Sequence, residues 1–324
     1  MKALEAAGAQ PIAAQHLPAA RVTFDGIDDP TGYLFSLAKS IACAVKHSPW
    51  AQYAEDIVAT SGFAFRMWVR EDLCGSATST WYWNNIKPWV ESGGFACAYI
   101  GRYWDEKKVE KKKRLEAVAL AKQSIDRGIP AVSWDIGLPE WGLLTGYDDK
   151  AKTFAALSQV KGESEMPYKK LGKCEIPILC LLAITGRTGK SQENILRDTM
   201  RLAVTHLEGR EDCDRELTQG LAAYPSLIKH FEAEDSAFAL CWNMEYHLGT
   251  YGALKHYAWK YFQKMEQREL AGLYREIADA WLAAFEIKRG EEINQPEGRQ
   301  KIAAFLKNAH ERETQAVEIM RRGL

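Results

Sequence analysis

The chain has 324 residues, of which 47% are hydrophobic and 26% are charged, and its formal net charge is -1. This composition is typical of a packed globular protein and excludes a disordered chain. Because the charge is close to zero, the sequence gives no general attraction to nucleic acid or to an anionic membrane, and neither is expected as a partner. The length allows one large domain or two ordinary ones.

Residues 1–20 are expected to form an N-terminal tail. They contain no continuous apolar run of the length that a secretory signal needs. The longest apolar run in the chain, residues 176–184, is far shorter than a bilayer span. The seven cysteines are scattered and contain no CxxC pair, which favours free thiols in a reducing compartment over disulfides or a zinc site. We therefore expect a cytoplasmic protein with no metal and no cofactor.

The character of the sequence changes near residue 188, and the change predicts two domains. Residues 21–188 alternate short apolar strands with helices, whereas residues 189–324 are almost entirely helical in pattern. In the first domain we expect helices over 30–45 and 101–127, strands over 64–69, 96–100, 131–136, 142–147, 153–159 and 176–185, and a polar loop over 161–168. In the second we expect helices over 191–208, 216–233, 235–267, 270–287 and 298–322.

Residues 128–149, GIPAVSWDIGLPEWGLLTGYDD, predict a β-hairpin. The first arm is rich in β-branched and aromatic residues, and the second ends at the polar turn of Asp148 and Asp149. Acidic and aromatic residues lie together at the connection, where Asp135 and Glu140 are each next to a tryptophan. Desolvation by an indole ring raises the pKa of a carboxyl group, so either residue could serve as a general acid or base.

Residues 186–191, GRTGKS, follow an apolar strand and open a helix, as a phosphate-binding P-loop does. A P-loop requires a glycine at the position that Ile184 occupies, so we expect no phosphate site here. Ser191 is instead expected to cap the helix that follows.

The helical domain carries an aromatic stripe with a spacing of four residues that includes Trp242 and Tyr246. This spacing favours a helix face that packs into the core. The alternative is that the small residues after it open a pocket against the first domain, with Glu245, His247 and His256 supplying polar groups. His247 and His256 lie on opposite faces of a helix, so a shared metal ion is not expected.

Four segments occur in the order GFAFRMWV at 62–69, GIPAV at 128–132, EWGLLTGYDD at 140–149 and MPYKKLG at 166–172. Together with the turn and helix near the N-terminus, this order resembles the papain-like domain of the BtrH-type acyltransferases of butirosin biosynthesis, which a helical region follows. The resemblance implies an α+β, C39-peptidase-like fold with a mainly antiparallel sheet, followed by an all-α domain. It also implies a cysteine at the start of the first helix and a histidine at the start of the second hairpin strand.

Neither of these catalytic residues is present. Thr31 is the nearest occupant of the cysteine position, and Glu140 occupies the histidine position. No histidine lies between residues 48 and 205, which excludes a Cys–His or Ser–His pair built wholly within the strands of the first domain. A threonine with a carboxylate partner is a poor pair, because a carboxylate of ordinary pKa cannot usefully deprotonate a hydroxyl group at neutral pH.

Two interpretations remain open. In the first, acyl transfer or amide hydrolysis has moved to other residues, with Cys74 as the nucleophile in its loop of glycine and serine, and Asp135 and Glu140 as acid or base. In the second, the interdomain cleft binds a small molecule, a peptide or an acyl-carrier group, and the protein is a catalytically silent binding or scaffold protein. A homodimer is compatible with both. The residues expected to contact the ligand are Trp134, Trp141, Thr31, Tyr33, Trp242, Glu245 and Tyr246.

Overall fold

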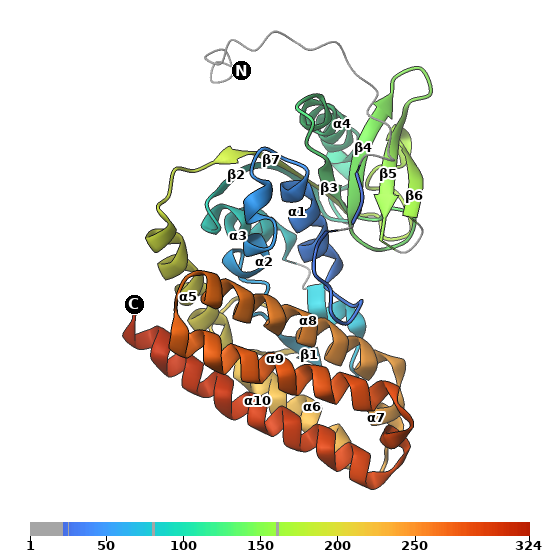
Figure 1. Ribbon diagram of the computed structural model, residues 1–324. Helices are drawn as coiled ribbons and strands as arrows, with labels where there is room; N and C mark the ends of the chain where they lie inside the picture. The colour runs from blue at the N-terminus through green and yellow to red at the C-terminus, as the bar shows by residue number, and fades with distance from the viewer. Residues whose placement is uncertain (1–21, 25, 80–81, 160–161) are drawn as a thin grey trace.

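The computed structural model describes residues 22–324 except 25, 80, 81, 160 and 161, so the expected N-terminal tail lies outside the described residues. The protein is α+β. A β-sheet and its helices form one part, and a C-terminal helical region forms the other (Figure 1). Within the described ranges, no helix has both the length and the apolar character needed to cross a bilayer.

The longest helices all lie in the C-terminal helical region. The first part contains α1 Ser36–Lys46, α2 Asp56–Thr60, α3 Ile86–Ser92 and α4 Glu110–Asp126. The helical region contains α5 Gln192–Leu207, α6 Ala223–Glu232, α7 Ala237–Leu240, α8 Trp242–Lys264, α9 Arg268–Arg289 and α10 Pro296–Arg322. Short 3-10 turns lie at η2 Ala51–Tyr53, η3 Gly75–Ser79, η4 Trp83–Asn85, η5 Lys107–Val109, η6 Tyr168–Lys170, η7 Gly220–Ala222 and η8 Glu291–Asn294. The long helix α9 packs beside both α8 and α10 (Figure 1).

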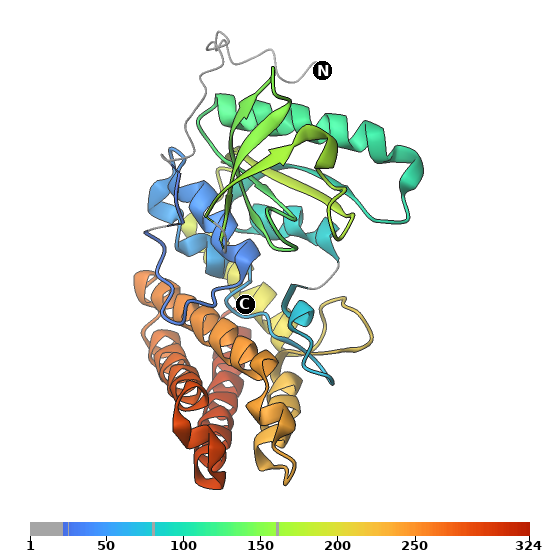
Figure 2. The same cartoon turned by 90° about the vertical axis from the view of Figure 1, so that its right-hand side faces the viewer.

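Among the described residues, six strands form one antiparallel sheet in the order β2-β7-β3-β4-β5-β6. Their bounds are β2 Phe95–Arg102, β3 Ala131–Ser133, β4 Gly142–Asp148, β5 Thr153–Ser158, β6 Gly162–Pro167 and β7 Leu179–Arg187. The predicted hairpin is confirmed, since Val132 of β3 pairs with Leu143 of β4. These two side chains belong to the core on the α1 face, whereas Ala131 and Leu144 face α4, so the two helices cover opposite faces (Figure 2).

The polar loop expected over 161–168 is wrong, because residues 162–167 form β6 at the edge of the sheet. Glu163 and Glu165 are exposed, and Met166 is buried with the α4 face. An edge strand with one solvated face keeps a polar composition, and this made the segment resemble a loop.

The first helix begins at Ser36, later than the expected start at residue 30. The side chain of Asp29 accepts hydrogen bonds from the backbone N–H groups of Gly32 at 3.0 Å and Leu34 at 3.1 Å. Gly32 has a φ of 75°, in the left-handed region that glycine tolerates best. The segment before α1 is therefore a turn closed by Asp29, and the helix starts only after it.

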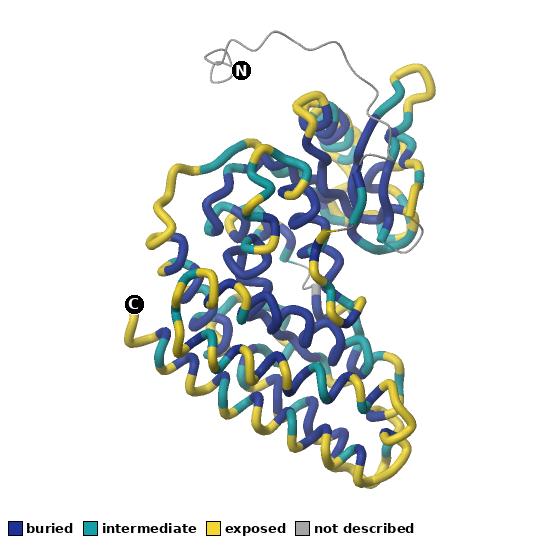
Figure 3. Tube along the Cα trace, in the orientation of Figure 1, coloured by how far each residue is buried: buried dark blue, intermediate teal, exposed yellow. Residues whose placement is uncertain are grey.

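Residues of the first part enter the core of the helical region. The strand expected over 64–69 is reduced to β1, Trp68–Arg70, which pairs with β8, Leu217–Gln219. The backbone N–H of Met67 donates to His206 Nε2 at 2.7 Å, and that of Trp68 donates to the Tyr251 hydroxyl at 3.0 Å. One hydrophobic core runs through both parts, as the buried segments in Figure 3 show, while the boundary expected near residue 188 stays a prediction.

Candidate functional site

A cavity of about 300 Å³ lies where α1, the hairpin connection and the start of α8 meet. We call it the tryptophan cavity, because three tryptophans contribute to its wall. Among the described residues that line it, Glu140 is the only charged one. The residues that line the tryptophan cavity are Phe35, Ser36, Gly75, Ser76, Thr78, Trp134, Pro139, Glu140, Trp141, Ile176, Trp242 and Tyr246.

The hairpin connection holds Glu140 in place through its backbone. The Glu140 carbonyl oxygen accepts hydrogen bonds from the N–H groups of Asp135 at 2.9 Å and Ile136 at 3.2 Å. Asp135 adopts a φ of 64°, which is uncommon for a residue other than glycine and lets the chain turn back on itself here. The connection therefore fixes the direction in which the Glu140 side chain leaves the sheet.

The Glu140 carboxyl group meets the hydroxyl group of Ser36 at the first turn of α1. Ser36 Oγ donates a hydrogen bond to Glu140 Oε2, and the Ser36 carbonyl accepts one from Gln159 Nε2 at 2.8 Å. Burial raises the pKa of Glu140, and the hydrogen bonds from Ser36 and from the Trp141 backbone oppose that rise. The site thus holds a hydroxyl group and a carboxyl group at a helix N-terminus, where backbone N–H groups have no helical partner.

The sequence pattern does not identify Ser36, because it predicts a helix that starts at residue 30 and so points to Thr31. The signal that could have found it is the turn pattern of Asp29 and Gly32, which places the helix start after Leu34. Once the start is moved, Ser36 is the first residue of α1.

The aromatic wall of the cavity is a packed cluster of rings. The ring centroids of Trp134 and Trp141 are 5.3 Å apart, and Trp83 lies 4.9 Å and 4.8 Å from them. Trp141 is buried, and its indole Nε1–H has no hydrogen-bond partner within the described part of the chain. Elsewhere in the lining, Trp242 stacks on Tyr246 with centroids 5.4 Å apart, and Trp242 is 60% exposed.

Three predicted ligand-binding residues lie outside the cavity lining and instead fix the loop before α1 to α8. Thr31 Oγ1 donates to the Gly249 carbonyl at 2.8 Å, and the Tyr33 hydroxyl donates to Glu245 Oε1 at 2.8 Å. A Cβ on Gly249 would lie 2.7 Å from the Tyr33 ring, so this glycine admits the loop rather than opening a pocket. These residues therefore connect two elements next to the cavity, the loop before α1 and the helix α8, without lining it.

Glu140 is the only one of the three predicted catalytic residues that lines the cavity. Asp135 is buried beside it, accepts a hydrogen bond from the Ile176 N–H at 3.4 Å, and has its pKa raised by burial. Cys74 Sγ lies 3.0 Å from Ser76 Oγ, and Ser76 rather than Cys74 reaches the lining. No contact found among the described residues joins Cys74 to either carboxyl group.

The two histidines considered for the pocket have separate partners. His247 Nδ1 lies 2.7 Å from the Asn243 carbonyl, and His256 Nε2 lies 2.6 Å from Asp28 Oδ2. In the ranges that the structure covers, no group of histidine, cysteine or acidic side chains could hold a metal ion. Ser191 caps α5 as predicted, accepting a hydrogen bond from the Asn194 N–H at 3.2 Å.

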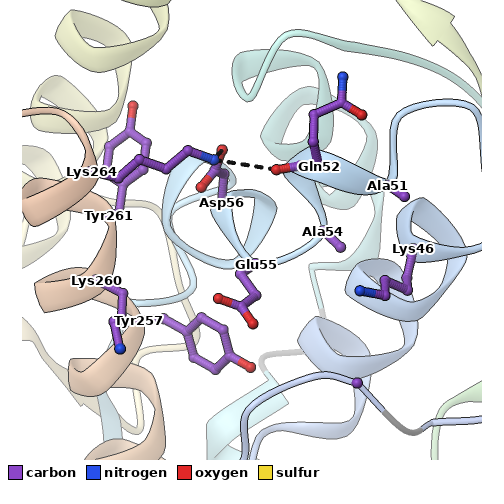
Figure 4. Close-up of a pocket in the computed structure, with 11 residues that line it drawn as sticks. Lys46, Ala51, Gln52, Ala54, Glu55, Asp56, Tyr257, Lys260, Tyr261 and Lys264 are labelled. Carbon is purple, nitrogen blue, oxygen red and sulfur yellow. Dashed lines mark hydrogen bonds and ion pairs between the residues drawn. The ribbon is translucent and has the colours of Figure 1, made fainter.

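A second cavity, of about 370 Å³, lies between the end of α1, α2 and α8 (Figure 4). Its lining mixes lysines with the acidic residues Glu55 and Asp56. Lys264 Nζ already lies 2.7 Å from Asp56 Oδ2 and 3.2 Å from the Gln52 carbonyl. Because these charges are mixed and partly paired with one another, the tryptophan cavity is the stronger candidate.

Comparison with protein-family models and with curated proteins gave no match, so the geometry of the tryptophan cavity carries the functional inference.

Proposed function

We propose that this protein binds a small molecule in the tryptophan cavity. The observation that carries the proposal is a cavity with aromatic walls around one partly buried carboxyl group, which is hydrogen-bonded to Ser36. Small-molecule sites are mostly apolar and contain a few placed polar groups, in volumes of roughly 300–1,000 Å³. The cavity volume of about 300 Å³ fits a ligand at the small end of this range.

The positions of Ser36 and Glu140 support the papain-like interpretation of the fold. The resemblance to BtrH-type acyltransferases implies a nucleophile at the start of the first helix and its partner at the start of the second hairpin strand. Ser36 is the first residue of α1, and Glu140 lies two residues before β4 begins at Gly142. The two side chains are in hydrogen-bond contact, as such a pair requires.

Ligand binding is tested by a thermal-shift screen of a fragment library. Because a ligand that binds only the folded state stabilises it, a fragment at about 100 times its Kd adds roughly 2.7 kcal/mol. We expect fragments that raise the Tm of the wild-type protein and of Trp104→Ala, a control at a tryptophan that is 49% exposed and outside the cavity lining. Trp242→Ala should lose most of this rise. Equal rises in both variants for every active fragment would contradict the proposal.

A second candidate function is acyl transfer through Ser36, and the contact between Ser36 Oγ and Glu140 Oε2 favours it. An ester or thioester would supply the acyl group. Ser36 Oγ attacks the acyl carbonyl and gives its proton to the Glu140 carboxylate, the bond to the alcohol or thiol breaks, and the proton passes to that leaving group. An amine or alcohol acceptor then attacks the Ser36 ester, the ester C–O bond breaks, and the acceptor's proton passes through Glu140 back to Ser36 Oγ. Because burial raises the pKa of Glu140, its carboxylate is a stronger base than an ordinary one.

A serine-directed fluorophosphonate probe separates the two candidates. If acyl transfer occurs, peptide mass spectrometry should find the label on Ser36, Ser36→Ala should abolish that label, and Glu140→Gln should slow labelling by about 100-fold. Ser226→Ala is the control, because Ser226 is on α6 and outside the cavity lining, and it should leave the rate unchanged. Labelling that is absent, or that Ser36→Ala does not affect, would reject acyl transfer and leave the binding function.

A further inference from the structure

The described lining of the tryptophan cavity contains an acidic residue and no basic one. Glu140 is the single charged residue among those that line it. Among the described residues, no ion pair joins Glu140 to a lysine, arginine or histidine, and the hydrogen bonds to its carboxyl group come from the neutral hydroxyl group of Ser36 and the Trp141 backbone. Elsewhere in the protein, partly buried carboxylates such as Asp29 and Glu211 have a cationic partner. Glu140 is therefore a carboxylate without a counter-ion.

Aromatic side chains make up much of the lining around this carboxylate. Trp134 and Trp141 form one wall, and the stacked pair of Trp242 and Tyr246 forms another. The face of an aromatic ring carries partial negative charge, and tryptophan attracts a cation most strongly. The aromatic rings and the Glu140 carboxylate thus both favour a positively charged ligand.

We propose that the ligand of the tryptophan cavity is an organic cation, a protonated or quaternary amine with apolar substituents. This inference rests on the proposed binding function and names its ligand class. A cation supplies the counter-ion that Glu140 lacks, and its apolar substituents pack against Phe35 and Ile176 in the same lining. The negative charge of Glu140 would repel an anion, and a neutral ligand would leave this carboxylate without a counter-ion.

Choline and its neutral isostere 3,3-dimethyl-1-butanol test the ligand charge, because the two molecules differ mainly in one nitrogen that becomes carbon. We expect isothermal titration calorimetry to show that choline binds the full chain about tenfold more tightly than the isostere, in line with cation–π and carboxylate contacts. Glu140→Gln should reduce this preference to less than about threefold, because it removes the charge and keeps the shape. Glu163→Gln is the control, since Glu163 is exposed on β6 and lies outside the cavity.

A second variant, Trp242→Ala, tests the same cavity independently in case Glu140→Gln does not fold. Trp242→Ala removes an exposed ring from the wall and should weaken choline binding about fivefold, whereas Trp104→Ala should not change it. Equal affinities for the two probes, or tighter binding of the isostere, would overturn the cation inference while the binding function stands. If neither probe binds and no library fragment depends on Trp242, both the binding function and the cation inference are wrong.

Discussion

Replacing Glu313 with alanine is expected to lower the free energy of unfolding by about 3–5 kcal/mol, measured by urea denaturation at pH 7. Glu313 of α10 and Lys255 of α8 are both 0% exposed, and Lys255 Nζ lies 2.5 Å from Glu313 Oε1. The hydroxyl groups of Tyr224 and Tyr274 donate to the same carboxylate at 2.7 Å and 3.1 Å. Without Glu313, a buried ammonium group and two buried hydroxyl groups lose their shared acceptor.

A more exposed ion pair, between α9 and α10, provides the control. Arg312 Nε lies 2.7 Å from Glu276 Oε2 at the surface, so Glu276→Ala should cost less than about 1 kcal/mol. The double substitution Lys255→Met with Glu313→Leu should recover most of the lost stability, because neither charge is then left alone. A cost of Glu313→Ala no larger than that of Glu276→Ala would show that the buried pair does not hold α8 against α10.

The second large effect is expected at Glu211, which connects the residues before β1 to α5 and the loop after it. Its carboxylate accepts hydrogen bonds from Arg66 Nη2 at 2.7 Å and Nε at 2.9 Å, and it lies 2.9 Å from His206 Nδ1. Burial would raise the pKa of Glu211, but the charge of Arg66 and the hydrogen bonds from His206 and Arg66 lower it to about 2. The Arg66 side chain is itself buried and lies over the Trp89 ring, with 3.9 Å between Cζ and the ring centroid.

This lowered pKa makes stability depend on pH in a defined direction. The ordinary pKa is 4.5 and the folded value is about 2, a difference of about 2.5 units that corresponds to on the order of 3 kcal/mol. Because the folded pKa is depressed, this stability is present above pH 4.5 and is lost as the pH falls towards 2. Burial also lowers the pKa of His206, so its protonation below its ordinary value of 6.5 further favours the unfolded chain.

Urea denaturation of Glu211→Gln at several pH values between 7 and 3 tests this expectation. The variant should be less stable than the wild-type protein by on the order of 3 kcal/mol at pH 7, and its stability should fall less between pH 4.5 and 3. Glu216→Gln, at a side chain that is largely exposed, should follow the wild-type curve. A variant with the wild-type pH dependence would exclude Glu211 as a source of the acid sensitivity.

The parts of the fold that could be predicted are those in which local pattern and final structure agree. The hairpin over 128–149 has β-branched and aromatic arms around a turn, and the pairing of β3 with β4 follows from it. The same holds for the start of α5 at Ser191. By contrast, β1 pairs with β8 across about 150 residues of chain, and no local pattern specifies a partner that distant.

In the candidate site, too, some residues could be predicted from local sequence and others could not. Glu140, Trp141 and Trp242 were predicted because acidic and aromatic residues stand out in the sequence, and all three line the cavity. Ser36 was missed because its role depends on where a helix begins, and the Asp29 turn moved that start by a turn and a half. Cys74 was predicted only from the glycine and serine composition of its loop. In the structure Ser76, two residues further along the chain, lines the cavity and Cys74 does not.

Binding of a small molecule to the tryptophan cavity is tested most directly by fluorine NMR of the full chain labelled with 5-fluorotryptophan, recorded with the fragment that raises the Tm most. The resonances can be assigned from single Trp→Phe variants. We predict that the resonances of Trp134, Trp141 and Trp242 shift as the fragment is added, while those of Trp104 and Trp259, which lie outside the cavity lining, do not. Shifts confined to tryptophans outside the cavity, with those three unchanged, would contradict the proposed site.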